Sequence, residues 1–172
     1  MSKFSEQTLR SWEKPASENE EQRISNAIKM IKDAINSSEN LKDRRNNIEI
    51  FIQGSYANNT NVRSNSDVDV CVMIKKPFFS SYPDGWEKED YGFIKGNYGF
   101  NSFRLDLLNA LNNKFSDVEI GNKSLKLPSN SYRVETDAIP TFQYRNYRHN
   151  SSYDPDSFVE GVKFYSSNNE IV

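Results

Sequence analysis

Two carboxylates stand at the start of an apolar run in the middle of the chain. Asp67 and Asp69 open a valine-rich stretch that continues to Ile74. In an extended strand residues i and i+2 share a face, so both carboxylates point one way and the valines point the other. Two carboxylates this close repel each other unless a cation lies between them, and Mg²⁺ prefers oxygen ligands of this kind. The pair is a candidate metal site; the plain alternative is a solvated strand entrance after the polar residues 63–66.

A glycine and a serine lie upstream, directly after another apolar run. Gly54 lets the backbone turn and approach a ligand closely, and Ser55 supplies a hydroxyl and a backbone N–H. If residues 55–60 open with a helical turn, their free N–H groups form a site for a phosphate. Because the chain returns to Asp67 after a short polar arc, we expect the phosphate site and the carboxylates to be neighbours in space.

A third carboxylate is needed if two metal ions are to clamp a phosphoryl transfer. Asp137 is the leading candidate, because it lies near the end of a later predicted strand whose Val134, Thr136 and Ala138 alternate away from it. The alternative is that Asp137 is an ordinary edge-strand acid such as its neighbour Glu135. Asp67, Asp69 and Asp137 are therefore the candidate catalytic and metal-binding residues, and Gly54 and Ser55 the candidate nucleotide-binding residues.

The pattern of apolar residues predicts the elements that position these groups. One apolar stripe at three- and four-residue steps predicts a long helix that begins near Ser17 and continues to Ile35, after a short helix over residues 5–12. A second amphipathic helix is expected over residues 103–115. Strands are expected over residues 48–53, 68–74, 118–120, 124–127 and 132–139, with a further extended piece over 141–147.

This order of elements predicts an α+β fold. We expect a mixed central sheet flanked by the long N-terminal helix and the central helix. Residues 1–40 are expected to form a helical segment that packs on the core, and residues 41–172 the core itself. Residues 75–100, rich in Gly, Pro and aromatics, are expected to form a long ordered loop. Its aromatic side chains either pack on one another, which we favour, or stack on a base.

Composition narrows the classes of partner. The 172 residues carry a formal net charge of −2, so no global basic field for duplex nucleic acid is expected. The single cysteine, Cys71, lies in an apolar strand and is expected to be a buried small hydrophobe rather than a reactive thiol. No apolar run has the length of a signal peptide or a membrane span, so a soluble, cytoplasmic protein with no membrane partner is expected.

Several segments together resemble a known group of enzymes. The segments are "GSYANNTNVRSNSDVDVCVM", the preceding "SWEKPASENEEQRISNAIKMIKDAI", "GNK" after the central helix, and "YRVETDAIPTFQYR" around the third acid. The Gly-Ser to Asp-x-Asp element resembles the signature of the DNA polymerase β-like nucleotidyltransferase superfamily. The flanking segments are most similar to the N-terminal catalytic part of the bacterial cGAS/DncV-like nucleotidyltransferases, which make cyclic oligonucleotide signals in anti-phage defence (CBASS).

The resemblance implies roles for the candidate residues. Asp67 and Asp69 would bind both catalytic metals, Mg²⁺ or Mn²⁺, and Asp137 would join them on one metal and help deprotonate the attacking 3′-hydroxyl. Gly54 and Ser55 would hold the donor NTP, with ATP the first candidate and pyrophosphate the leaving group. Family members continue into a helical half that this chain lacks, so a missing C-terminal half or a regulatory protein is an expected partner. Two alternatives stay open: a catalytically incomplete nucleotide-binding or interaction module, and a transferase that adds a nucleotide to a protein or tRNA.

Overall fold

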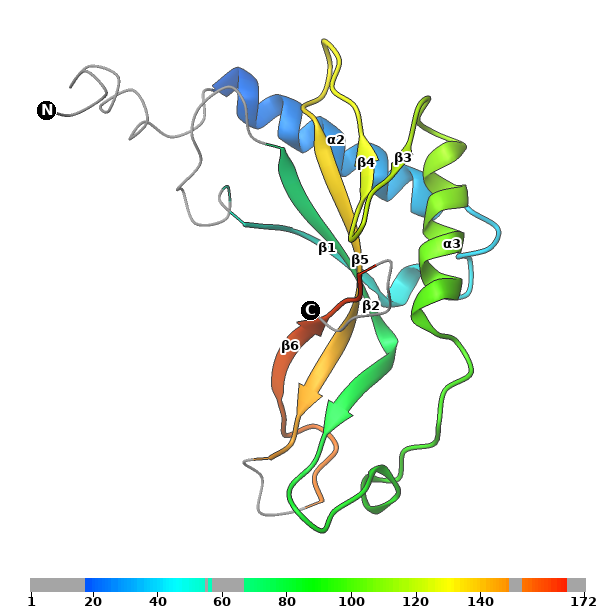
Figure 1. Ribbon diagram of the computed structural model, residues 1–172, viewed down its shortest axis with the longest axis vertical. Coiled ribbons are helices and arrows are strands. Elements are labelled where there is room, and N and C mark those ends of the chain that lie inside the picture. The colour runs from blue at the N-terminus through cyan, green and yellow to red at the C-terminus, as the bar shows by residue number, and fades with distance from the viewer. Residues whose placement is uncertain (1–17, 55, 57–66, 149–152, 167–172) are drawn as a thin grey trace, which may run out of the picture.

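Six strands form one mixed sheet, with two helices packed on it, in the computed structural model, which describes residues 18–54, 56, 67–148 and 153–166 (Figure 1). The elements are α2 (Glu18–Asn36), η1 (Arg45–Asn47), β1 (Ile48–Gln53), β2 (Val68–Ser81), η2 (Lys88–Tyr91), α3 (Phe100–Asn112), β3 (Glu119–Ile120), β4 (Leu125–Leu127), β5 (Thr136–Asn146) and β6 (Val159–Lys163). The expected α+β fold is confirmed. The helix expected over residues 5–12 lies outside the described residues.

The sheet has the order β1-β2-β5-β4-β3, and β6 pairs with the second half of β5. β2 and β5 run parallel at its centre, whereas every other neighbouring pair is antiparallel. The parallel pair is connected by the aromatic loop, α3 and the β3–β4 hairpin, as a parallel crossover requires. Two segments far apart in the sequence therefore share the middle of the sheet.

One hydrophobic core lies between the helices and one face of the sheet. The expected apolar stripe on α2 is buried at Ile24, Ala27, Ile31, Ala34 and Ile35. On α3, Phe103, Leu107 and Leu111 are fully buried. The strands contribute the valines of β2 and Ala138 and Phe142 of β5 to the same cluster. Because Val68, Val70 and Val72 are fully buried on this face, the alternate positions of β2 are turned to the other face.

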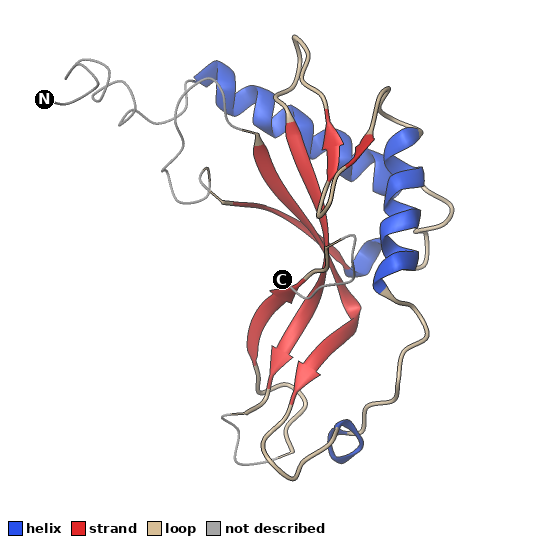
Figure 2. Ribbon diagram, in the orientation of Figure 1, coloured by secondary structure: helices blue, strands red, loops and turns tan. Residues whose placement is uncertain are grey.

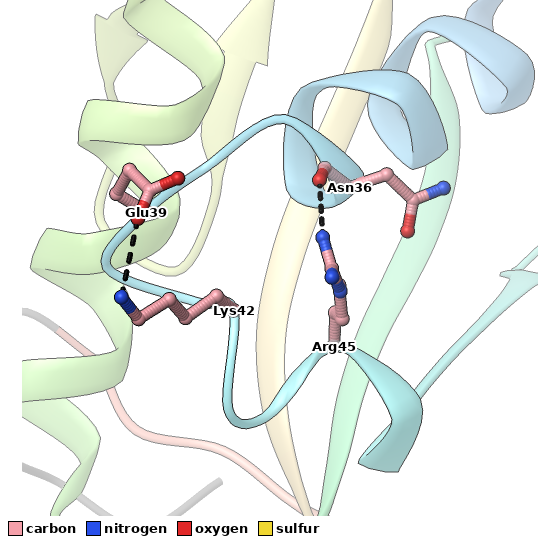
Figure 3. A network of polar contacts seen from close by, with 4 residues as sticks. All are labelled: Asn36, Glu39, Lys42 and Arg45. Atoms are coloured by element: carbon pink, nitrogen blue, oxygen red, sulfur yellow. Dashed lines mark hydrogen bonds and ion pairs between the residues drawn. The ribbon is translucent and has the colours of Figure 1, made fainter.

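The link between α2 and β1 is fixed by its own polar side chains (Figure 3). Arg45 donates a hydrogen bond of 2.9 Å to the backbone carbonyl of Asn36, one of the last carbonyls of α2, and Lys42 pairs with Glu39 at 3.3 Å. A cation at this end also interacts favourably with the helix dipole. Arg45 thus stabilises the C-terminus of the helix.

Three strands differ from the sequence expectation. β2 does not end at Ile74 but continues to Ser81 past a shift in register, and β5 begins at Thr136 and includes the expected separate extended piece. β6 was not expected at all. Figure 2 shows that β2, β5 and β6 together form a second, lower part of the sheet that the two long helices do not cover.

The aromatic loop packs on itself and on this lower part of the sheet. Tyr91 is 5% exposed, and its ring lies 4.6 Å from that of Tyr147; the rings of Trp86 and Tyr153 are 4.0 Å apart. Tyr82 stacks on Tyr147 with 5.5 Å between centroids. The favoured expectation of a self-packed loop is therefore confirmed for these residues. In the described part of the chain, no helix is both long and apolar enough to cross a bilayer.

Candidate active site

The register of three strands brings the end of β1 and the starts of β2 and β5 into one row. Gln53 pairs with Asp69 across the antiparallel β1–β2 ladder, and Asp69 pairs with Asp137 across the parallel β2–β5 ladder. The backbone N–H of Val68 also donates to the carbonyl of Glu135, which ties the start of β2 to β5. Side chains in one row of a sheet lie on the same face, and neighbouring strands are about 4.8 Å apart. Two of the three expected carboxylates are therefore direct neighbours.

Gly54 follows this row and lies against Asp69. Its φ of 76° is in the left-handed region, which residues with a side chain rarely adopt. A Cβ atom placed on Gly54 would lie only 2.5 Å from Oδ2 of Asp69. The absence of a side chain thus lets the backbone turn at the end of β1 and leaves room for the Asp69 carboxylate beside it. Ser55 and the phosphate-binding turn expected over residues 55–60 lie outside the described residues, apart from Tyr56.

Asp69 is affected by its neighbouring carboxylates. Burial, then the charge of Asp137 and then that of Asp67 raise the pKa of Asp69. Asp67 itself is exposed, one residue before β2 begins. Oδ1 of Asp137 is buried and has no hydrogen-bond partner among the described residues. A buried oxygen that lacks a hydrogen-bond donor and lies next to a second carboxylate lowers stability unless a cation binds both groups.

These observations fit a divalent cation. Carboxylate oxygens are the ligands that Mg²⁺ and Mn²⁺ prefer, and Asp137, whose Oδ1 is unpaired, lies in the same row as Asp69. In the side-chain positions that the described residues adopt, no three acidic, cysteine or histidine side chains already enclose a metal site. The fit therefore rests on Asp69 and Asp137 as a preformed pair, which the exposed Asp67 would have to join by side-chain rotation.

Cys71 and Gln53 form a side-chain contact next to Asp69. The Cys71 thiol donates a hydrogen bond of 2.6 Å to Oε1 of Gln53, the residue that pairs with Asp69. Cys71 is fully buried, and burial, followed by the charge of Asp69, raises the pKa of its thiol to about 12. The expectation of a buried cysteine is confirmed, and Gln53 has a structural partner.

A contact that the sequence did not indicate connects the loop after Gly54 to α2. The Tyr56 hydroxyl donates a hydrogen bond of 2.7 Å to Oε1 of Glu20 in the first turn of the helix. The two residues are 36 positions apart in the sequence, so their contact is seen only in the folded chain. This bond connects Tyr56 to the first turn of α2.

Comparison with known proteins places this geometry in a family. The family model described as "Nucleotidyltransferase domain" matches residues 35–128, a range that contains Gly54, Asp67 and Asp69. A cyclic dipyrimidine nucleotide synthase, CdnE, of Cecembia lonarensis is 43% identical over 166 residues, which are 95% of this chain and 54% of that protein. The cyclic GMP-AMP synthase CdnE03 of Staphylococcus schleiferi is 37% identical over 190 residues, covering 97% of this chain and 59% of the relative.

A solved structure agrees with these relatives. The Rhodothermus marinus CdnE c-UMP-AMP synthase, solved with Apcpp and Upnpp, superimposes with a TM-score of 0.79 at 29% sequence identity. The match covers 98% of this chain and 56% of the synthase chain. The chain thus spans about half the length of the relatives it matches. Because the family model matches more than half of the chain and the fold agrees with it, the chain belongs to the nucleotidyltransferase domain family.

Proposed function

We propose that this chain is the catalytic part of a metal-dependent nucleotidyltransferase of the cyclic-oligonucleotide-synthase type. It would join NTPs with release of pyrophosphate and so make a second messenger for anti-phage defence, in the cytoplasm where NTPs are available. The observation that carries the proposal is the pairing of Asp69 with Asp137 in one row of the sheet, with Gly54 against Asp69. The synthases to which the chain is similar support the type of product.

The residues would divide the work by position. Gly54 permits a close approach of the donor triphosphate to the backbone, and Ser55 would bind its phosphate oxygens. Asp67, Asp69 and Asp137 would hold Mg²⁺ or Mn²⁺, which when bound neutralises charge on the triphosphate. Asp137 would orient the 3′-hydroxyl of the acceptor and assist removal of its proton. Most of the rate enhancement would then come from positioning and from the electrostatics of the site.

Turnover of labelled NTPs tests the proposal. Wild type is incubated with α-labelled ATP, alone and with each other NTP, in Mg²⁺ or Mn²⁺, and compared with Asp69→Asn and Asp137→Asn. Asp84→Asn, an exposed acid in the aromatic loop, controls for the loss of one charge. We expect product from wild type and from the Asp84 variant, and none from the other two. Equal turnover in all four proteins would remove the assignment.

A second candidate is a module that binds a nucleotide without transferring it. The observation that favours it is that Gly54 and the Asp69–Asp137 pair would bind Mg²⁺ and a triphosphate whether or not transfer follows. Titration calorimetry with Mg²⁺ and ATP separates the two candidates. Metal-dependent binding without product after long incubation would support the module, whereas product of any linkage would support the synthase. A mass increase on a co-purified protein or tRNA would instead indicate transfer to a macromolecule.

A further inference from the structure

The row of side chains that contains the carboxylates continues onto β4. Lys126 pairs with Asp137 on the side away from Asp69, and Glu119 of β3 pairs with Lys126 in turn. The register therefore places one lysine on the same face as the carboxylates, next to the residue proposed to orient the acceptor. Nothing in the local sequence around Lys126 indicates this, because the neighbour is defined by the β4–β5 ladder.

The Lys126 side chain is half-buried between two acids in the row. In the described part of the chain its ammonium group forms no hydrogen bond and no ion pair, although Asp137 and Glu119 flank it in register. A lysine on a flexible stem normally pairs with an acid or extends into solvent. The Lys126 ammonium group can instead bind an additional anion next to Asp137.

The β3–β4 turn keeps this side chain beside the sheet. A Cβ atom on Gly121 would lie 3.6 Å from Cε of Lys126, an ordinary contact distance, so the lysine stem passes beside Gly121. Arg104 of α3 holds the turn, because its guanidinium donates to the carbonyl of Gly121 at 2.5 Å and to that of Asn122 at 3.1 Å. The Lys126 side chain therefore lies along a hairpin that Arg104 stabilises.

We propose that Lys126 binds phosphate oxygens of the acceptor nucleotide, the one whose hydroxyl lies at Asp137; this rests on the proposed function. The spacing of the strands indicates whether Lys126 can reach the acceptor or the donor nucleotide. Lys126 is one strand, about 5 Å, from Asp137 but three strands, about 14 Å, from the end of β1 where the donor phosphates would lie. A four-carbon stem spans the first distance and not the second.

Calorimetric titration of the whole chain tests this. The probe is the ATP analogue with a methylene group between the α and β phosphates, in excess Mg²⁺, which resists transfer and can occupy both nucleotide positions. We expect two binding events in wild type, and in Lys126→Met a second event weakened about tenfold or more with the first unchanged. Lys126→Arg should restore it. Lys75→Met is the matched control, since Lys75 is a half-exposed lysine of β2 that pairs with Glu49.

Two further measurements exclude a merely structural role. The second event of wild type should weaken with added salt more steeply than that of the methionine variant, since one phosphate contact is lost. Binding of adenosine, which has no phosphate, should be the same in both proteins. Thermal unfolding midpoints that agree between the two variants show that both lysine replacements leave the fold intact.

The possible failures are distinguishable. If wild type binds the analogue, Asp137→Asn weakens it and Lys126→Met matches Lys75→Met, the inference about Lys126 is wrong and the proposed function stands. If Lys126→Met instead tightens Mn²⁺ binding without nucleotide, Lys126 is a counter-ion of Asp137 and the phosphate role is overturned. If wild type binds no analogue with Mg²⁺, the proposed function fails and takes the role of Lys126 with it.

Discussion

Replacement of Gly54 by alanine tests the geometry at the end of β1 directly. The new Cβ would meet Oδ2 of Asp69 at 2.5 Å, and the backbone φ of 76° disfavours any residue with a side chain. Left-handed backbone costs about 1–2 kcal/mol. Displacement of the Asp69 side chain from its rotamer adds about 0.5–1.5 kcal/mol. We therefore expect Gly54→Ala to lower the free energy of unfolding and to move the Asp69 carboxylate.

Gly92 supplies a control with the same backbone and no contact. Its φ is 74°, and nothing lies within 4 Å of a Cβ built there. Alanine at Gly92 should therefore cost only the backbone part, and the gain from a stiffer unfolded chain is common to both glycines and cancels. The difference between the two variants, about 0.5–1.5 kcal/mol, isolates the contact with Asp69.

Urea denaturation measures this difference. With a slope of about 2 kcal/mol per molar urea, a 1 kcal/mol difference moves the midpoint by about 0.5 M. In an Asp69→Ala background the two alanine variants should become equal, because the carboxylate that Gly54 contacts is gone. We also expect Gly54→Ala, and not Gly92→Ala, to weaken binding of Mn²⁺ with ATP. Equal stability and equal Mn²⁺–ATP affinity of the two alanine variants would refute the reasoning.

Three other predictions concern Asp69 and its surroundings. In EDTA, the free energy of unfolding should rise as pH falls through the raised pKa of Asp69, and it should fall as pH rises, because the folded chain binds that proton more tightly. Urea titrations at several pH values measure this dependence, and Asp69→Asn should flatten it. The Cys71 thiol, with its pKa near 12, has only about one part in ten thousand as thiolate at pH 8. Ellman's reagent should therefore label it only after unfolding, and rapid labelling of the native chain would contradict its burial. Tyr56→Phe should lower the free energy of unfolding by about 1 kcal/mol and weaken ATP binding, whereas Glu20→Gln, which keeps an acceptor oxygen, should lose less.

The elements of the core were predictable because local patterns encode them. The stripe on α2 and the alternation in β2 are repeated over many residues, so the helix and the strand that carries Asp69 could be placed from the sequence. The end of β2 could not be placed, because Phe79 to Ser81 belong to the strand through their pairing with β5 past a register shift. β6 was missed for the same reason, because none of its five residues is buried and they carry no alternating pattern.

The candidate site likewise has residues that the sequence predicts and neighbours that it does not predict. Asp67 and Asp69 stand out in sequence because two acids at the start of an apolar strand need an explanation. That Asp137 lies opposite Asp69, and Lys126 opposite Asp137, depends on the register between strands, which no local signal specifies. Tyr56 and Glu20 meet only because α2 packs beside the end of β1. Pairings across the sheet are therefore the part that required the structure.

The parallel pairing of β2 with β5 also constrains when the site can appear during folding. Asp69 and Asp137 are separated by the aromatic loop, α3 and the β3–β4 hairpin, so closing that long loop must precede their meeting. Contacts so distant along the chain form late and slow the folding of a domain. During synthesis, a ribosome-bound chain that has not yet exposed β5 has β2 and Gly54 but no partner for Asp69. Affinity for a divalent ion should consequently arise only in the final stage of folding, when the two central strands dock.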